Sequence, residues 1–251
     1  MDIFKKNLIN TTTMIDSGAG NTNASRYLID GNTGIRFVTT GFSSTAAMIN
    51  VSFSAATVVS HVILQNHNID EIYVYYDNTT TGCVFFTCSN SSKEFFIEFP
   101  SVTANSIQVV LGRTFPMNDE KRVGELIISE KRYTWDRNPS IPLYKYKTER
   151  NQIVHTLSDG GTSVYNIGEN FKADIKWRFI NDSMNTQFLD LFNGLEDFVF
   201  IPNPLYTCPA AWDGFAHPVY WLGDYDFKPA TEDESAGYSG IMRFRGASKQ
   251  R

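Results

Sequence analysis

Residues 46–53 read AAMINVSF and residues 71–77 read EIYVYYD, two stretches in which apolar side chains recur at every second position. Successive side chains of a strand point to opposite faces of a sheet, so each stretch places one apolar row inward. Residues 94–99 and 106–112 show the same alternation, residues 60–66 form a nearly continuous apolar run, and residues 123–129 close the series of predicted strands. Polar turn clusters such as residues 77–82, 89–93 and 103–105 separate these runs at short intervals. This spacing predicts an antiparallel β-sandwich, with no helix before about residue 130.

The composition fits a mainly β protein and excludes several other classes. Of the 251 residues, 42% are hydrophobic, 14% are aromatic and 20% are charged, and the net charge is −5. This balance argues against disorder, and a chain of this length buries enough apolar surface to fold without disulfides or a structural metal. The acidic charge predicts no nucleic-acid specificity. No apolar run suits a secretory signal or a membrane span, so we expect neither secretion nor membrane insertion.

Between Lys131 and Arg150 the alternating pattern stops. This segment contains Pro139 and Pro142 together with several basic residues, and it has no clear period. Proline favours extended backbone and blocks helix formation, so we interpret residues 133–150 as a linker between two domains, residues 1–132 and 151–251. The alternative interpretation is a crossing strand that docks on one of the domains.

The second half combines strands with a single helix and is predicted to be an α+β domain. Residues 151–168 indicate a hairpin, with Asp159, Gly160 and Gly161 in its turn. Residues 169–180, ENFKADIKWRFI, alternate so that Phe171, Ala173, Ile175, Trp177 and Phe179 face inward. Residues 181–195 begin with Asn-Asp-Ser and place apolar residues at helical spacing, which predicts an amphipathic helix of about a dozen residues. We expect Trp177, Phe188 and Phe192 to form part of the core.

Residue types that carry catalysis are present without the spacing that catalytic motifs require. No nucleophile elbow, phosphate-binding glycine loop or dinucleotide fingerprint occurs. Cys83 and Cys88 lie five residues apart, unlike a zinc or redox pair, and we expect all three cysteines to be thiols in a reducing cytoplasm. The four histidines are expected to have structural roles, with His217 stacking on aromatic rings. We therefore predict that the chain is not an enzyme.

Residues 24–65 resemble the opening of discoidin or coagulation-factor C-type domains. Leu28-Ile29-Asp30-Gly31 matches the apolar–Asp–Gly turn of that family, and residues 107–129 match its closing strands, with Glu125 at a Glu–apolar position. These domains are eight-stranded jelly-roll β-sandwiches of the galactose-binding-like class. The resemblance covers about residues 20–132 and implies this fold for the first domain.

The resemblance also implies where a sugar would bind. In this family loop aromatics stack on sugar rings while polar neighbours bind the hydroxyls. Candidate ligand-binding residues are therefore Tyr27, Phe42, Tyr133 and Trp135.

A calcium ion is the one cofactor that the resemblance suggests. Members of the family often hold calcium near the Asp–Gly turn through oxygen ligands, which makes Asp30 and Glu125 the candidate metal ligands. Ile35 and Phe37 stand where the family has Thr and Trp, so one oxygen ligand is lost and the case for calcium is weaker. The alternative is that Asp30 caps a turn and Glu125 faces solvent.

The second half is similar, in the order of its elements, to structural proteins of bacteriophage tail tips and baseplates. The hairpin, the alternating strand, the helix and a last strand ending in RFRGAS follow the plan of tail-tube and distal-tail folds. This resemblance implies a structural virion protein, made in the host cytoplasm, that assembles as a homo-oligomer with other tail or baseplate proteins. Its discoidin-like module would dock or attach to a host glycan, with many copies strengthening a weak contact.

A loop near the C-terminal strands holds two further candidate residues. Trp212 and Phe215 lie in a loop rich in aromatics and prolines, which we interpret as an interface or as a lid over the core. The alternative function is a stand-alone, lectin-like carbohydrate-binding protein. A glycan-degrading enzyme is the least favoured function, because its paired carboxylates are not visible in a sequence.

Overall fold

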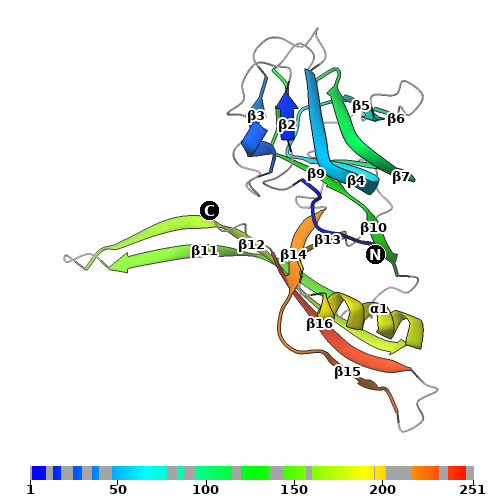
Figure 1. The fold of residues 1–251 in the computed structure, drawn as a ribbon. Coiled ribbons are helices and arrows are strands. Elements are labelled where there is room, and N and C mark those ends of the chain that lie inside the picture. The colour runs from blue at the N-terminus through cyan, green and yellow to red at the C-terminus, as the bar shows by residue number, and fades with distance from the viewer. Residues whose placement is uncertain are drawn as a thin grey trace. The chain divides into compact units, whose positions relative to one another are not determined.

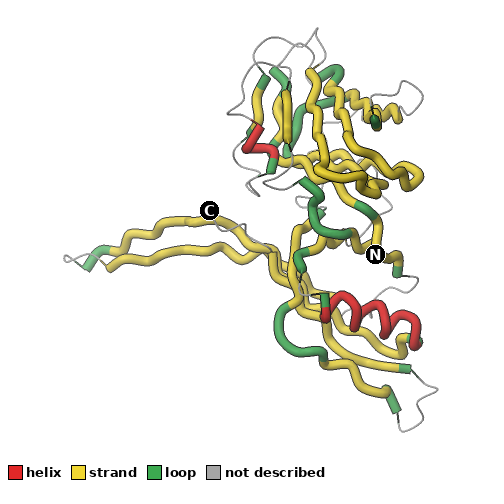
Figure 2. Tube along the Cα trace, viewed as in Figure 1, coloured by secondary structure: helices red, strands yellow, loops and turns green. Residues whose placement is uncertain are grey.

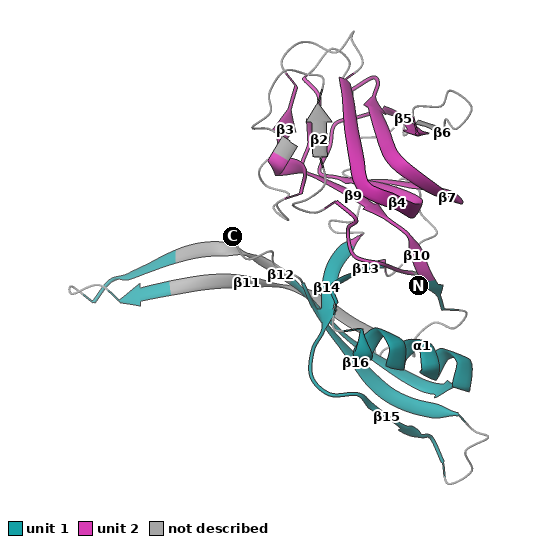
Figure 3. Ribbon diagram, in the orientation of Figure 1, with its two compact units in different colours: residues 1, 133–200, 217–250 teal, residues 2–132, 201–216, 251 magenta. Residues whose placement is uncertain are grey.

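The computed structural model describes residues 2–9, 14–17, 25–29, 36–39, 47–77, 84–87, 94–114, 120–135, 144–156, 160–194, 196–201, 216–231 and 237–246. These residues are mainly in β-strands, with one α-helix among them (Figures 1 and 2). The chain divides into two compact units (Figure 3). We call residues 2–132 and 201–216 the sandwich unit, and residues 133–200 and 217–250 the helix unit.

The sandwich unit is built from antiparallel strands and a short 3-10 helix. Its elements are β1 (Asp2–Phe4), β2 (Met14–Ser17), η1 (Ser25–Leu28), β3 (Phe37–Val38), β4 (Ala47–Gln65), β5 (Glu71–Tyr76), β6 (Val84–Thr87), β7 (Glu94–Leu111), β8 (Arg122–Val123) and β9 (Glu125–Ser129). Strand β10 (Lys131–Thr134) begins in this unit and ends in the helix unit. The larger sheet has the order β2-β4-β7-β5-β6, β9 also pairs with β4, and β3 pairs with β8.

One hydrophobic core fills the sandwich unit. Buried residues of β4, β5 and β7, such as Val51, Val74 and Val109, meet buried residues of β3, β8, β9 and η1, such as Phe37 and Leu28, in a single cluster. Period-two alternation is what places these side chains on one face of the sheet. The predicted fold class, mainly β with a sandwich in the N-terminal half, is confirmed.

Two pairs of predicted strands are in fact two long strands. β4 covers both of the predicted strands 46–53 and 60–66, and β7 covers 94–99 and 106–112. The β4–β7 register shifts between Ser52 and Thr57 and again between Val59 and His61. Extra residues in one strand of a pair bend it without ending it. Residues 103–105, which we interpreted as a polar turn, therefore lie within the continuous strand β7.

The helix unit contains an antiparallel sheet, whose strands differ in length, and helix α1. Its elements are β11 (Tyr144–Thr156), β12 (Thr162–Ile180), α1 (Asp182–Asn193), β13 (Phe198–Ile201), β14 (His217–Trp221), β15 (Asp226–Pro229) and β16 (Tyr238–Gly246). The strand order is β13-β14-β16-β12-β11, and β15 pairs with β16 (Figure 1). Residues 144–150, part of the predicted linker, belong to β11, which pairs with β12 from Tyr144 onward.

The predicted hairpin is longer than expected and forms an arm. β16 pairs only with residues 172–180 of β12, so among the described residues the stretch 162–170 pairs with β11 alone. We call residues 149–156 and 162–170 the arm, which extends beyond the rest of the sheet in Figure 1. Val154 and Val164 lie opposite each other on it, with 59% and 53% of their surface exposed.

Helix α1 begins and ends close to where the sequence predicts. The Asn181 side chain accepts a hydrogen bond from the Met184 backbone nitrogen at 2.9 Å, which caps the first turn, and Gly194 follows the last turn. Met184, Phe188 and Leu191 are buried. None of the described helices is long and apolar enough to span a bilayer.

Aromatic packing holds α1 on the sheet. The Phe188 ring lies 5.2 Å from Trp177 and 4.9 Å from Trp135, centroid to centroid, and Trp135 meets Trp177 edge-on at 5.3 Å. Trp177 and Phe188 are fully buried, as predicted, while Phe192 is half-buried against Trp221. Edge-to-face contacts of this kind add to the free energy of area burial.

Phe179 departs from the predicted alternation. Its φ of 56° is in the left-handed region, and the β12–β16 register shifts between Trp177 and Ile180. The shift turns Phe179 outward, with 52% of its surface exposed, and buries Ile180 in its place. The strand pattern therefore ends at Trp177, two residues earlier than the sequence indicates.

Candidate functional site

The outer face of the larger sheet in the sandwich unit carries aromatic and amide side chains. On β5 the side chains that alternate with the buried ones point away from the core. Two cross-strand rows run over β4, β7 and β5. We call the six residues of these rows the tyrosine face: Met48, Val110 and Tyr73 in one row, and Asn50, Gln108 and Tyr75 in the other.

The tyrosine face is uncharged, and charges at its edge are paired. All six of its residues are of uncharged types, and the Gln108 Nε2 group donates a hydrogen bond to Asn50 Oδ1 at 2.7 Å. At the start of β5 the Arg113 guanidinium lies 3.0 Å from Glu71 Oε1 and 3.1 Å from Asp70 Oδ2. The neutral surface is thus bordered by an arginine that is paired with two carboxylates.

This arrangement suits a neutral ligand with many hydroxyl groups. Tyr73 and Tyr75 are half-buried, so each offers part of a ring held in place by its neighbours, and Met48 is 43% exposed. Aromatic and apolar surface contacts the C–H faces of a sugar ring, while amides exchange hydrogen bonds with its hydroxyls. The alternation of residues 71–77 places Tyr73 and Tyr75 on one face of their strand. No signal in the sequence joins them to Asn50 and Gln108, which the register of β4, β7 and β5 brings beside Tyr75.

Three of the four predicted sugar-binding aromatics lie within the described residues. Tyr27, on η1, packs half-buried against the sandwich core, with the Arg26 guanidinium 4.9 Å from its ring centroid. Phe42 lies outside the described residues. The Tyr133 hydroxyl donates a hydrogen bond to the Asp190 carboxylate of α1. Trp135 is only 3% exposed, and the assignment of these four residues to sugar binding stays a prediction.

The calcium prediction stays untested, and the described residues do not add to it. Asp30 lies outside the described residues. Glu125, on β9, is 3% exposed and pairs with Gln65 of β4, so it does not face solvent. No group of three or more His, Cys, Asp or Glu side chains suited to a metal occurs within the described ranges. Trp212 and Phe215, the predicted interface residues, also lie outside them.

One histidine has polar neighbours that resemble a catalytic arrangement. His61 Nδ1 lies 2.6 Å from Ser60 Oγ, and His61 Nε2 lies 3.6 Å from Glu98 Oε1. Ser60 and His61 are both buried, and Ser60 Oγ accepts a hydrogen bond from the Lys131 backbone nitrogen. A hydroxyl that no substrate reaches cannot act as a nucleophile, so this group holds β4 against its neighbours.

The electrostatics of His61 agree with a structural role. Its ring packs against Phe4, with centroids 4.4 Å apart, and against Phe96 at 5.2 Å. Burial, with a smaller contribution from the charge of Lys131, lowers the pKa of His61 to about 3. The imidazole is therefore neutral at pH 7, and its contact with Glu98 is not an ion pair. The stacking predicted for His217 is confirmed, because its ring centroid lies 3.7 Å from that of Phe171.

No family model matches this chain, and no curated protein matches it. Solved structures of carbohydrate-binding modules do show similarity. One is chitosan-binding module 1 of a chitosanase/glucanase from Paenibacillus sp. IK-5, with 18% identity, 50% of this chain and 99% of that chain covered, and a TM-score of 0.40. A second is the family 32 module of NanJ from C. perfringens in complex with galactose, with 16% identity, 50% and 98% coverage, and a TM-score of 0.40. A third, CpGH89CBM32-5 from Clostridium perfringens in complex with GalNAc-β-1,3-galactose, has 11% identity, 46% and 94% coverage, and a TM-score of 0.38.

Proposed function

We propose that this chain is a non-catalytic carbohydrate-binding protein whose sandwich unit binds a neutral glycan on the tyrosine face. The observation that carries the proposal is the uncharged, half-exposed surface of Tyr73, Tyr75, Asn50 and Gln108, in rows set by the β4–β7–β5 register. Rings and amides on a rigid sheet need little reordering on binding, which lowers the entropic cost.

Calorimetry with the purified full chain tests the proposal. Galactose and GalNAc-β-1,3-galactose, the saccharides in two of the similar structures, serve as probes beside longer neutral oligosaccharides. Because the ligand is neutral, the affinity should not change between low and high salt. Replacing Tyr73 or Tyr75 with alanine should weaken binding by about two- to tenfold, the effect of losing an aromatic contact.

The matched control is Tyr220→Ala, which removes an exposed tyrosine of the helix unit. It should leave the affinity for these glycans unchanged. If the chain binds neutral glycans and neither Tyr73→Ala nor Tyr75→Ala weakens the binding, the tyrosine face is not the site. If no neutral glycan binds at millimolar concentration, the proposed function itself is wrong.

A second candidate function is structural, as a subunit of a bacteriophage tail tip or baseplate, and the arm is the observation that favours assembly. A two-stranded hairpin is marginal alone, and Val154 and Val164 form an exposed apolar pair on it. Light scattering after size-exclusion chromatography separates the two candidates. A structural subunit should form a concentration-dependent oligomer that the double substitution Val154→Lys and Val164→Lys disrupts, whereas a stand-alone binding protein stays monomeric.

A further inference from the structure

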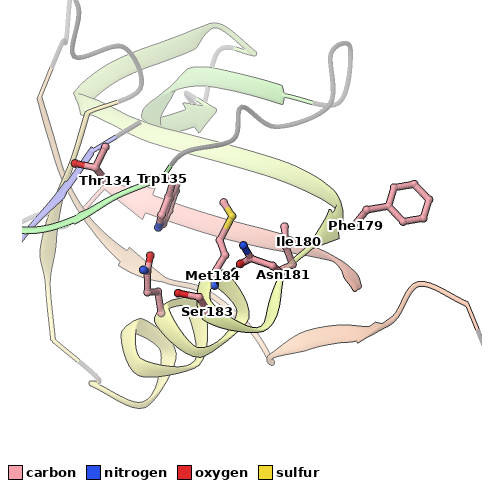
Figure 4. Close-up of a pocket in the computed structure, with 8 residues that line it drawn as sticks. Thr134, Trp135, Phe179, Ile180, Asn181, Ser183 and Met184 are labelled. Carbon is pink, nitrogen blue, oxygen red and sulfur yellow. Dashed lines mark hydrogen bonds between the residues drawn. The ribbon is translucent and has the colours of Figure 1, made fainter. Parts of the chain in front are cut away.

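A small pocket lies in the helix unit where β12 ends and α1 begins (Figure 4). Its volume is about 210 Å³, smaller than the roughly 300–1,000 Å³ of pockets that hold drug-sized ligands. It therefore has room for a ligand of about one sugar ring. Its lining residues are Thr134, Trp135, Phe179, Ile180, Asn181, Ser183, Met184 and Gln187.

The indole of Trp135 brings an unpaired donor to this pocket. Trp135 is 3% exposed, and its Nε1 group is buried without a hydrogen-bond partner among the described residues. Figure 4 shows the indole nitrogen turned toward the side of the pocket formed by α1. A buried donor without a partner costs free energy, and proteins usually satisfy such groups. A bound molecule with an acceptor oxygen would remove this cost.

The surroundings of the indole favour a neutral ligand over an anion. Among the described residues, no lysine, arginine or histidine lines the pocket. The helix N-terminus, which attracts negative charge, is already complemented by Asp182 in the first turn of α1. The remaining polar groups are the hydroxyls of Thr134 and Ser183 and the amides of Asn181 and Gln187.

The backbone at the entrance is held in an unusual conformation. A positive φ is uncommon in a residue other than glycine, and such strain occurs most often at functional sites. Phe179 has this conformation, which turns its ring away from the other lining side chains (Figure 4). Because Phe179 leaves the strand face, the space between Trp135 and the first turn of α1 is not filled by its ring.

We infer that this pocket is a second binding site, which holds one neutral sugar ring. Trp135 Nε1 donates a hydrogen bond to an oxygen of that sugar. The site lies in the helix unit and goes beyond the proposed function, which concerns the tyrosine face. Apolar contact comes from Ile180, Met184 and the indole, and the hydroxyls and amides around them bind the sugar hydroxyls.

The test is a titration of the full chain with galactose, followed in a proton–nitrogen correlation spectrum. The chain has 4 tryptophans, so the spectrum shows a few indole signals, and Trp135→Phe identifies the one from Trp135. That signal should shift and saturate as galactose rises to about 50 mM, a concentration that populates weak sites. Ser183→Ala and Gln187→Ala, which remove polar groups outside the core, should each weaken the binding by about two- to tenfold.

Leu189→Ala, on the exposed side of α1, is the matched control and should leave the titration unchanged. Tyr73→Ala should also leave the Trp135 shift unchanged, so failure of this site and failure of the tyrosine face are distinguishable. A Trp135 indole signal that does not move with galactose overturns the inference. If that signal shows only exchange of its proton with water, an ordered water satisfies the indole, and the inference is likewise wrong. A shift that Ser183→Ala and Gln187→Ala do not affect also overturns it.

Discussion

Replacing His61 with glutamine should flatten the response of the sandwich unit to acid. In the folded chain the pKa of His61 is lowered to about 3 by burial, whereas the unfolded chain has the ordinary value of 6.5. Between these two values the unfolded state binds a proton that the folded state does not. Stability is therefore lost as the pH falls below 6.5, at about 1.4 kcal/mol for each pH unit.

The contribution of this one residue is about 2 kcal/mol between pH 7.5 and pH 5, since the pKa difference covers the 1.5 units between pH 6.5 and pH 5. Urea unfolding followed by far-ultraviolet circular dichroism at both pH values measures it. His61→Gln removes the titrating group, so its loss of stability over this range should be smaller than that of the unchanged chain by about 2 kcal/mol. Carboxylates contribute equally to both proteins and cancel in the difference.

His155→Gln is the control, because His155 is exposed on β11. It should not reproduce the difference of about 2 kcal/mol expected for His61→Gln. The reasoning is refuted if His61→Gln and the unchanged chain lose the same stability between pH 7.5 and pH 5. A histidine resonance of His61 that titrates near pH 6.5 in the folded chain would contradict the same reasoning directly.

Three further substitutions, two of them paired with a control substitution, test the helix unit, and thermal unfolding by calorimetry measures each of them. Asn181→Ala removes the cap of α1 and should cost about 1 kcal/mol, and a stability equal to that of the unchanged chain would show that the cap is not used. Phe188→Ala, in the core, should cost about 3–5 kcal/mol, while Leu189→Ala beside it should cost little, and equal losses would contradict the assigned helix face. Gly240→Ala should disrupt the β15–β16 pairing, because a Cβ there lies 2.4 Å from a backbone oxygen, whereas Gly160→Ala meets no atom within 4 Å and should cost only the strain of its positive φ.

Local patterns in the sequence predict where the strands and the helix of this fold lie. They do not predict which neighbouring strands are joined into one long strand. The alternation of residues 71–77 and the Asn-Asp-Ser start of α1 depend on neighbouring residues alone, so strand β5 and the helix are found where expected. The bulges that join residues 47–65 into one strand depend on pairing with β7, which is far away in the chain. Polar residues at a bulge and at a turn look alike in a sequence.

The candidate sites were harder to predict for a related reason. The ring of Trp135 packs against the buried Trp177 and Phe188, and nothing near residue 135 in the sequence indicates these contacts. The positive φ of Phe179 is equally invisible in a run that alternates without interruption. Side chains brought together by register or by packing between distant elements are the part that a single sequence does not reveal.

Strand β12 has a mechanical consequence. It is one uninterrupted strand of 19 residues, roughly 60 Å long at about 3.3 Å per residue, and it runs from the turn of the arm to the residue before the cap of α1. No loop separates its two ends. A force applied at the arm is therefore carried along a hydrogen-bonded strand as far as Trp177, and the register shift between Trp177 and Ile180 is the first irregularity that it meets on the way from the sheet to the pocket.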